Sequence, residues 1–192
     1  MGFTRAQLEG FRDATVPDLL AANTRLLFVG INPGLWTAAA QAHFARRGNR
    51  FYPALQRAGV IDRPIDASDG YTAADLAHLR DIGIGITNLV PRATARADEL
   101  TSTELADGGR RLTRLVEQVR PAVVAVLGVT AYRVAFARPR AVVGRQDERV
   151  GGSALWVLPN PSGLNAHSSL ADLAAAYREA ALAAGLHVGP RW

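Results

Sequence analysis

The chain has 192 residues, of which 48% are hydrophobic and 20% charged, and its formal net charge at pH 7 is +5. This composition supports one folded domain with an α/β-type core and argues against a wholly disordered chain. The sequence contains no cysteine and no lysine, which excludes disulfides, thiolate metal sites, iron–sulfur clusters and Schiff-base chemistry through a lysine side chain.

Apolar runs and helix signals alternate along the chain. Residues 1–24 are predicted to form a helical lead-in that ends near Pro17, ahead of a core that spans residues 25–185. Short apolar runs predict buried strands at residues 25–30, 82–90, 122–128 and 154–158. Periodicity and stop signals predict helices at residues 49–59, 72–80, 101–119, 129–137 and 170–184. This alternation predicts a three-layer α/β/α fold with a central four-stranded parallel sheet, in a single domain over residues 1–192.

Cellular location and association are inferred from what the sequence lacks. Charged residues interrupt the first fifteen positions, so no secretory signal is visible, and the longest apolar run, residues 122–129, is too short to span a membrane. We therefore expect a cytoplasmic protein that is monomeric and does not bind membranes. The positive charge suits a polyanionic partner, although many basic proteins bind no nucleic acid.

The first predicted strand runs directly into the turn Gly-Ile-Asn-Pro-Gly at residues 30–34. Two glycines and a proline make a rigid turn whose backbone amides can point at a ligand, and Asn32 is its polar side chain. In a parallel sheet, binding sites form beyond the carboxyl ends of the strands, where this turn is expected to lie. Taken alone, an asparagine in such a turn more often bonds its own backbone.

A second loop, residues 160–165 with the sequence NPSGLN, follows the last predicted strand. Leu164 stands there among small and polar residues. Exposed leucines are common, but proteins that distort duplex DNA insert an apolar side chain of this kind into the base stack. A catalytic turn beside a wedge loop, on a basic chain, is the combination that base flipping requires.

Four motifs occur in order: GINPG at residues 30–34, NRF at 49–51, TNLV at 87–90 and NPSGL at 160–164. Together they resemble the mismatch-specific uracil/thymine-DNA glycosylase family of the uracil-DNA glycosylase superfamily, over about residues 25–185. The resemblance implies a uracil-DNA glycosylase-like fold that acts without a cofactor or metal. Its partner would be double-stranded DNA with a mismatched or damaged pyrimidine. The implied activity is monofunctional hydrolysis of the N-glycosidic bond of uracil, with etheno-cytosine and thymine as further candidate substrates, leaving an abasic site.

The resemblance also implies roles for single residues. Asn32 would position the hydrolytic water, although other branches of the superfamily carry an aspartate there. The base would be held by backbone amides and side chains of Ile31, Gly34, Phe44, Asn88 and Asn160. The loop that penetrates the helix and faces the orphaned guanine would comprise Gly163, Leu164 and Asn165. Contacts to phosphates are expected from Arg46, Arg47, Arg50 and Ser162, whereas Arg110, Arg111 and Arg114 repeat at helical spacing and are expected to be a solvated face.

Several of these positions have ordinary structural interpretations. Phe44 could be a core residue, and Asn88 a strand-end cap. His43 and His167 are left outside the catalytic set, because a histidine near a loop is more often solvated. Ala166 and His167 stand where some family members carry an arginine, so the strictness of the guanine preference stays open.

Two other functions are compatible with parts of this pattern. Because a neutral amide is a weak activator, the protein could be a mismatch- or damage-binding protein with little catalytic turnover. The GINPG turn could also cradle the phosphate of a small nucleotide, but the chain has no lysine and proline removes one amide. The absence of lysine also argues against a glycosylase that forms an imine and nicks the strand.

Overall fold

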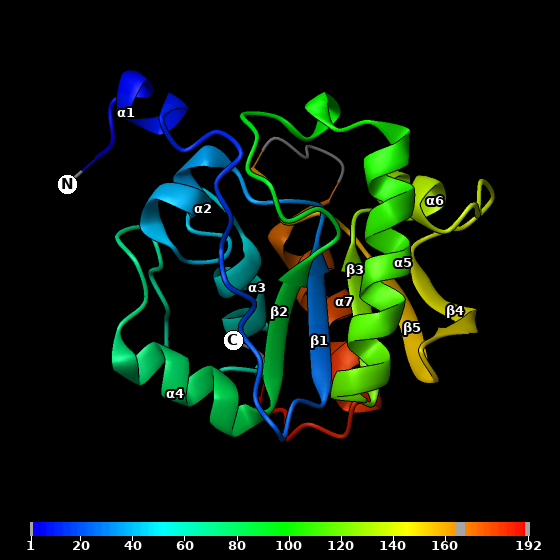
Figure 1. Cartoon of the computed structure of the whole chain (residues 1–192). Coiled ribbons are helices and arrows are strands. Elements are labelled where there is room, and N and C mark those ends of the chain that lie inside the picture. Colours follow the sequence, from blue (N-terminus) through cyan, green and yellow to red (C-terminus); the bar gives the residue numbers. More distant parts are fainter. Residues whose placement is uncertain (1, 164–167, 191–192) are drawn as a thin grey trace.

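The apolar runs of the sequence become the strands of one central sheet, in a computed structural model that describes residues 2–163 and 168–190 (Figure 1). The strand order is β2-β1-β3-β5-β4. The strands are β1 (Leu26–Gly30), β2 (Ile84–Asn88), β3 (Val123–Leu127), β4 (Gly144–Val150) and β5 (Ser153–Leu158). Every residue of β1, β2 and β3 is buried, as expected for parallel strands that are covered on both faces.

The prediction of a four-stranded parallel sheet is wrong in one element. The four predicted strands pair in parallel, but β4 adds a fifth strand that runs antiparallel to β5 at the edge of the sheet. Its sequence, GRQDERV, has no apolar run because most of the strand is open to solvent. Charged side chains on an exposed edge strand also discourage pairing with other chains. For both reasons the sequence of β4 lacks the apolar pattern from which the other strands were predicted.

Successive residues of the central strands face two different helical layers. Leu26 and Phe28 pack in the same core as the helices α3 (Phe51–Arg57), α4 (Ala73–Ile82) and α7 (Leu170–Ala183). Leu27 and Val29 pack with α5 (Ser102–Val119) and α6 (Val129–Ala135) on the opposite side. The sheet is therefore enclosed between two helical layers (Figure 1), as the sequence predicted.

The N-terminal segment differs from the predicted helical lead-in. Only α1 (Arg5–Glu9) is helical, and Asp13 adopts a positive φ of 62°, which no continuing helix allows. The chain then passes along the edge of the sheet, where Leu19 makes an isolated antiparallel bridge to Ile86 of β2. A second helix that was not predicted, α2 (Leu35–Ala40), begins immediately after the GINPG turn.

The helices α4, α5 and α7 begin within one residue of their predicted starts. Capping boxes begin α4 at Thr72, α5 at Thr101 and α7 at Ser169. Among the described residues, no helix is both long and apolar enough to cross a membrane.

Backbone contacts join the loop after β1 to the loop after β2 at the carboxyl ends of these strands. The amides of Leu89 and Val90, which follow β2, donate to the carbonyls of Gly30 and Ile31, and the amide of Thr94 donates to the carbonyl of Pro33. Gly108 of α5 approaches this loop so closely that a Cβ there would lie 2.6 Å from the carbonyl oxygen of Leu89. The GINPG turn is thus held by its neighbour in the sheet.

Candidate active site

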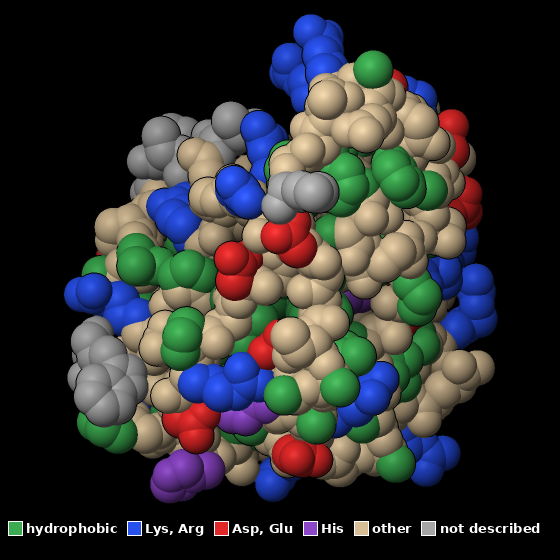
Figure 2. Space-filling view, turned by 90° about the vertical axis from the view of Figure 1, so that its left-hand side faces the viewer, with side chains coloured by type: hydrophobic (Ala, Val, Ile, Leu, Met, Phe, Trp, Pro, Cys, Tyr) green, Lys and Arg blue, Asp and Glu red, His purple; other side chains and the backbone are tan. Residues whose placement is uncertain are grey.

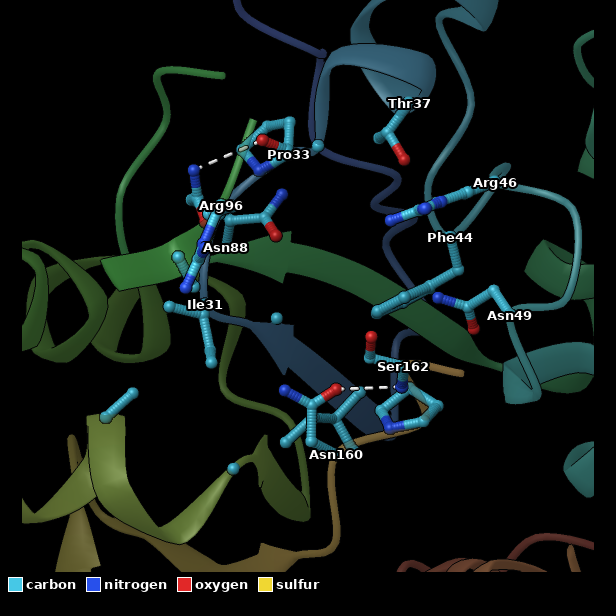
Figure 3. A pocket seen from close by; sticks show the side chains of 18 of the residues that line it. Ile31, Pro33, Thr37, Phe44, Arg46, Asn49, Asn88, Arg96, Asn160 and Ser162 are labelled. Atoms are coloured by element: carbon cyan, nitrogen blue, oxygen red, sulfur yellow. Dashed lines mark hydrogen bonds between the residues drawn. The ribbon is translucent and has the colours of Figure 1, made fainter. Parts of the chain in front are cut away.

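A pocket of about 750 Å³ opens at the carboxyl ends of the parallel strands (Figure 3). The loops after β1, β2, β3 and β5 all contribute to its wall. The structure brings together eight of the residues predicted for the site: Ile31, Asn32, Gly34, Phe44, Arg46, Asn88, Asn160 and Ser162. Of the other predicted residues, Arg47, Arg50 and Gly163 do not line the pocket, whereas Leu164 and Asn165 lie outside the described residues.

The Asn32 side chain is held by its amide nitrogen. Nδ2 donates to the carbonyl oxygens of Pro33 and Arg92, each at 3.1 Å, and to Oγ1 of Thr94 at 2.7 Å. The Thr94 hydroxyl donates its hydrogen to the Arg96 carbonyl oxygen at 2.7 Å. It can therefore only accept a hydrogen bond from Asn32. Because every atom around this end of the amide is an acceptor, Asn32 must present NH₂ here. Its Oδ1 is turned the other way, and no described residue donates a hydrogen bond to it.

Thr94 is a residue of the candidate site that reasoning from the sequence missed. Its side chain is 1% exposed, and it lies in the loop after β2, 62 residues from Asn32. The sequence offered one weak signal for this position, namely a small hydroxyl residue that follows a predicted buried strand. Through this hydrogen bond Thr94 holds the Asn32 amide in place.

Replacing Thr94 by valine should slow any reaction that depends on Asn32. Valine has nearly the same shape but no acceptor, so Asn32 loses its shortest hydrogen bond and the Arg96 carbonyl loses a donor. We expect the single-turnover rate to fall about tenfold, the equivalent of one hydrogen bond of about 1.4 kcal/mol, with substrate affinity nearly unchanged. Thr94→Ser retains the hydroxyl and should keep the wild-type rate. Equal rates for the valine and serine variants would refute the positioning role.

Asn88, at the end of β2, contacts a buried histidine. His43 is 2% exposed, its Nε2 lies 3.0 Å from the Pro17 carbonyl oxygen, and its Nδ1 lies 3.4 Å from Nδ2 of Asn88. Burial lowers the pKa of His43 below its ordinary value of 6.5, because desolvation disfavours the charged ring. His43 is therefore a neutral, structured residue of the pocket wall, contrary to the expectation of a solvated side chain.

The depressed pKa of His43 makes stability depend on pH. Below about pH 6.5 the unfolded chain takes up a proton on this histidine that the folded chain resists, so the free energy of unfolding should decrease as the pH falls. The contribution is fully present above pH 6.5 and is lost through the acidic range below it. Urea unfolding between about pH 7.5 and about pH 5.5 should show a shallower pH dependence for His43→Gln than for the wild type. The exposed His187→Gln variant is the control, and identical slopes for His43→Gln and the wild type would contradict this assignment.

Phe44 presents an aromatic ring to the pocket from a strained backbone. Its φ of 57° lies in the left-handed region, which bulky residues rarely adopt. Its ring stacks on Phe51 of α3, with centroids 4.0 Å apart and planes inclined by 25°. Phe44 is only partly buried and lines the pocket, so the ring can offer a stacking surface to a planar ligand.

Asn160 and Ser162 form a turn at the end of β5. The Ser162 amide donates to Oδ1 of Asn160 at 2.9 Å, so the amide oxygen of this asparagine serves its own loop. Figure 3 shows the nitrogen of the same amide turned toward the side of the pocket where Ile31 lies. Asn160 thus reaches the pocket wall from the end of β5, and its amide oxygen is bound within its own loop.

The predicted phosphate-binding arginines differ in their surroundings. Arg46 lines the pocket, and the side chains of Arg46 and Arg47 are both exposed. The Arg50 guanidinium donates to the carbonyl oxygens of Ser162 at 3.0 Å and Ser168 at 2.5 Å. Phosphate contacts by these residues stay a prediction, and the guanidinium of Arg50 links the backbone at Ser162 to the backbone at Ser168.

The remaining charges are dispersed. In the second arginine cluster, Arg110 pairs with Asp107 and Arg114 is exposed, but Arg111 donates to the backbone carbonyl of Asn88. Figure 2 shows that on the face turned toward the viewer basic and acidic side chains are interspersed with apolar ones, without a single basic patch. Within residues 2–163 and 168–190, no group of three or more histidine and acidic side chains is arranged to hold a metal ion.

Comparison with known proteins gives this pocket a family context. A model of the uracil DNA glycosylase superfamily matches residues 17–184 of the chain. The fold is similar to the solution NMR structure of a protein from Methanosarcina acetivorans that is described as a candidate uracil DNA glycosylase. The TM-score is 0.59 at 20% sequence identity, and the match covers 87% of this chain and 97% of that chain. At this identity the likeness establishes a shared fold.

Proposed function

This chain belongs to the uracil DNA glycosylase superfamily, and on that premise we propose that it is a monofunctional glycosylase that excises uracil from mismatched duplex DNA. We further propose that it acts as a monomer of the mismatch-specific uracil/thymine-DNA glycosylase type. The proposal is carried by the Asn32 amide, whose nitrogen donates to three acceptors, whereas none of residues 2–163 and 168–190 donates a hydrogen bond to its oxygen.

The proposed reaction places a water molecule against Asn32 Oδ1. The N-glycosidic bond breaks with its electron pair going to the base, which leaves an oxocarbenium-like sugar. The water oxygen bonds to C1′ of that sugar and loses a proton. A neutral amide cannot keep the proton, so it passes to the departing base anion or to solvent. Asn32 thus contributes orientation, which can account for several powers of ten in rate without a strong general base.

The remaining pocket residues suit the base that is released. Phe44 provides a stacking face, and Asn88 provides an amide at the edge of the bound ring. We place Asn160 beside the departing base, because it lines the pocket and its amide nitrogen faces the side where Ile31 lies. Because Asn160 is a neutral amide and not a cationic imidazole, we expect little stabilisation of a poor leaving base. Excision of undamaged thymine should therefore be slower than excision of uracil.

A panel of duplexes tests this proposal. Protein in excess is incubated with strands that carry uracil, etheno-cytosine or thymine opposite guanine, and uracil opposite adenine, and abasic sites are revealed by hot alkali. We expect single-turnover excision in the order uracil, etheno-cytosine, thymine opposite guanine. Intact DNA together with a tight gel shift would favour a damage-binding protein, and strand cleavage without alkali would contradict the monofunctional assignment.

A further inference from the structure

His43 and Asn88 form a buried pair in the pocket wall. Neither residue takes part in the hydrolytic step proposed above. Asn88 is 6% exposed and His43 is 2% exposed. Asn88 ends β2, whereas His43 lies in the segment after α2, 45 residues away in the chain. Two polar side chains from distant segments that meet at the edge of a binding pocket are candidates for setting its specificity.

The hydrogen positions on His43 follow from its partners. The Pro17 carbonyl can only accept, so Nε2 of His43 carries the ring hydrogen. Burial lowers the pKa of the ring, which is therefore neutral near pH 7 and leaves a lone pair on Nδ1. The Asn88 atom that faces this lone pair must then be the amide nitrogen, at 3.4 Å.

The histidine is itself fixed in place. Its backbone amide donates to the Tyr71 hydroxyl at 3.1 Å, and its carbonyl accepts from the Tyr52 hydroxyl at 3.0 Å. Together with the bond to Pro17, these contacts hold the main chain and the ring. Nδ1 is thus a preset acceptor, and Asn88 has one favoured amide orientation.

That orientation determines what the pocket offers. Asn88 Oδ1 lies over Gly30, where a Cβ atom would be only 2.4 Å away, and no described residue donates to this oxygen. The pocket therefore presents an acceptor together with the second hydrogen of Nδ2. Uracil carries an N3–H donor beside its C4 carbonyl, which matches this pair, whereas cytosine carries an N3 acceptor beside an amino group, which opposes it.

We propose that His43 is the positioning residue that restricts the pocket to bases with a uracil-type edge, by holding the Asn88 amide in a single orientation. Without the Nδ1 acceptor, the amide can turn over and present NH₂ to cytosine N3. The inference rests on the proposed function, because it concerns which base is admitted to the same pocket. It assigns discrimination against cytosine to a residue that need not touch the base.

Two substitutions separate this role from a structural one. In His43→Gln the side-chain amide reaches the position of Nε2 and can still donate to Pro17, but no atom replaces Nδ1. In His43→Asn the amide oxygen stands near the position of Nδ1 and can accept from Asn88, but the bond to Pro17 is lost. His43→Gln therefore loses the contact that positions Asn88 and keeps the hydrogen bond to Pro17. His43→Asn keeps the contact with Asn88 and loses the hydrogen bond to Pro17.

The readout is binding of duplexes that carry a non-cleavable 2′-fluoroarabino uridine or 2′-fluoroarabino cytidine opposite an abasic analogue, so that base pairing does not contribute. We expect the preference for uracil over cytosine to fall about 10- to 100-fold in His43→Gln, mainly through tighter binding of cytosine. His43→Asn should keep the wild-type preference within about threefold despite lower stability. The exposed His187→Gln variant should match the wild type.

The outcomes also separate this inference from the proposed function. If His43→Gln weakens binding of both bases equally, or if His43→Asn loses the preference as well, the positioning role is overturned while uracil excision by the wild type stands. If the wild-type protein neither binds nor cleaves uracil-containing DNA, the proposed function itself fails.

Discussion

Replacing Asn32 by alanine should reduce single-turnover excision of uracil by about 10²- to 10³-fold, the range that loss of a positioned polar group costs in an active site. Alanine removes the amide oxygen that would orient the water. It adds no bulk, so the pocket keeps its shape and the flipped base can still enter. The affinity for a uracil·guanine duplex, measured by fluorescence anisotropy, should change by less than about threefold.

The substitution also releases the acceptors that surround Nδ2, so folding must be checked separately. Loss of these hydrogen bonds should lower the free energy of unfolding by about 1 kcal/mol, which a urea titration would resolve. Assays well below the melting temperature then report chemistry alone. An alanine variant that excises uracil within about threefold of the wild-type rate would show that Asn32 does not orient the water.

Replacing Gly30 by alanine should reduce uracil excision about 100-fold, because the new methyl group occupies the place of the Asn88 amide oxygen. The added Cβ would lie 2.4 Å from Asn88 Oδ1 and 3.5 Å from Cζ of Phe44. The backbone of Gly30 does not have a positive φ, so alanine is conformationally acceptable and the effect arises at the side chain. Displacement of Asn88 should weaken binding of the base as well as slow its release.

Gly189→Ala is a suitable control for this variant. Its Cβ would meet a neighbouring carbonyl oxygen at an ordinary 3.7 Å, and Gly189 does not line the pocket. We expect it to retain the wild-type rate. Wild-type activity in Gly30→Ala, with normal binding of uracil-containing DNA, would mean that the Asn88 amide has no part in holding the base.

The fold was largely predictable because its central strands are buried on both faces. Such strands must be apolar throughout, as β1 and β3 are, and their helices begin at side-chain caps that are legible in the sequence. Where burial is incomplete the signal disappears. The edge strand β4 is mostly exposed and charged, and the short helix α2 follows a turn that already contains proline and glycine, so neither was predicted.

The candidate site was predictable to the extent that it consists of strand ends. Because parallel strands end at one edge of the sheet, motifs that are remote in sequence, such as those of Asn32 and Asn160, were expected to meet, and both line the pocket. Thr94 and His43 could not be identified in this way. Their hydrogen bonds to Asn32 and Asn88 span 62 and 45 residues of the chain, and these contacts exist only once the fold has formed.

Mass spectrometry of a reaction between the protein in excess and a uracil·guanine duplex tests the glycosylase assignment most directly. We expect free uracil and an unbroken strand that carries one abasic site, with release slowed strongly in Asn32→Ala. A borohydride-trapped protein–DNA adduct would rule out hydrolysis by an oriented water. A duplex that stays bound and intact, with no free uracil, would show that this pocket is not a glycosylase active site.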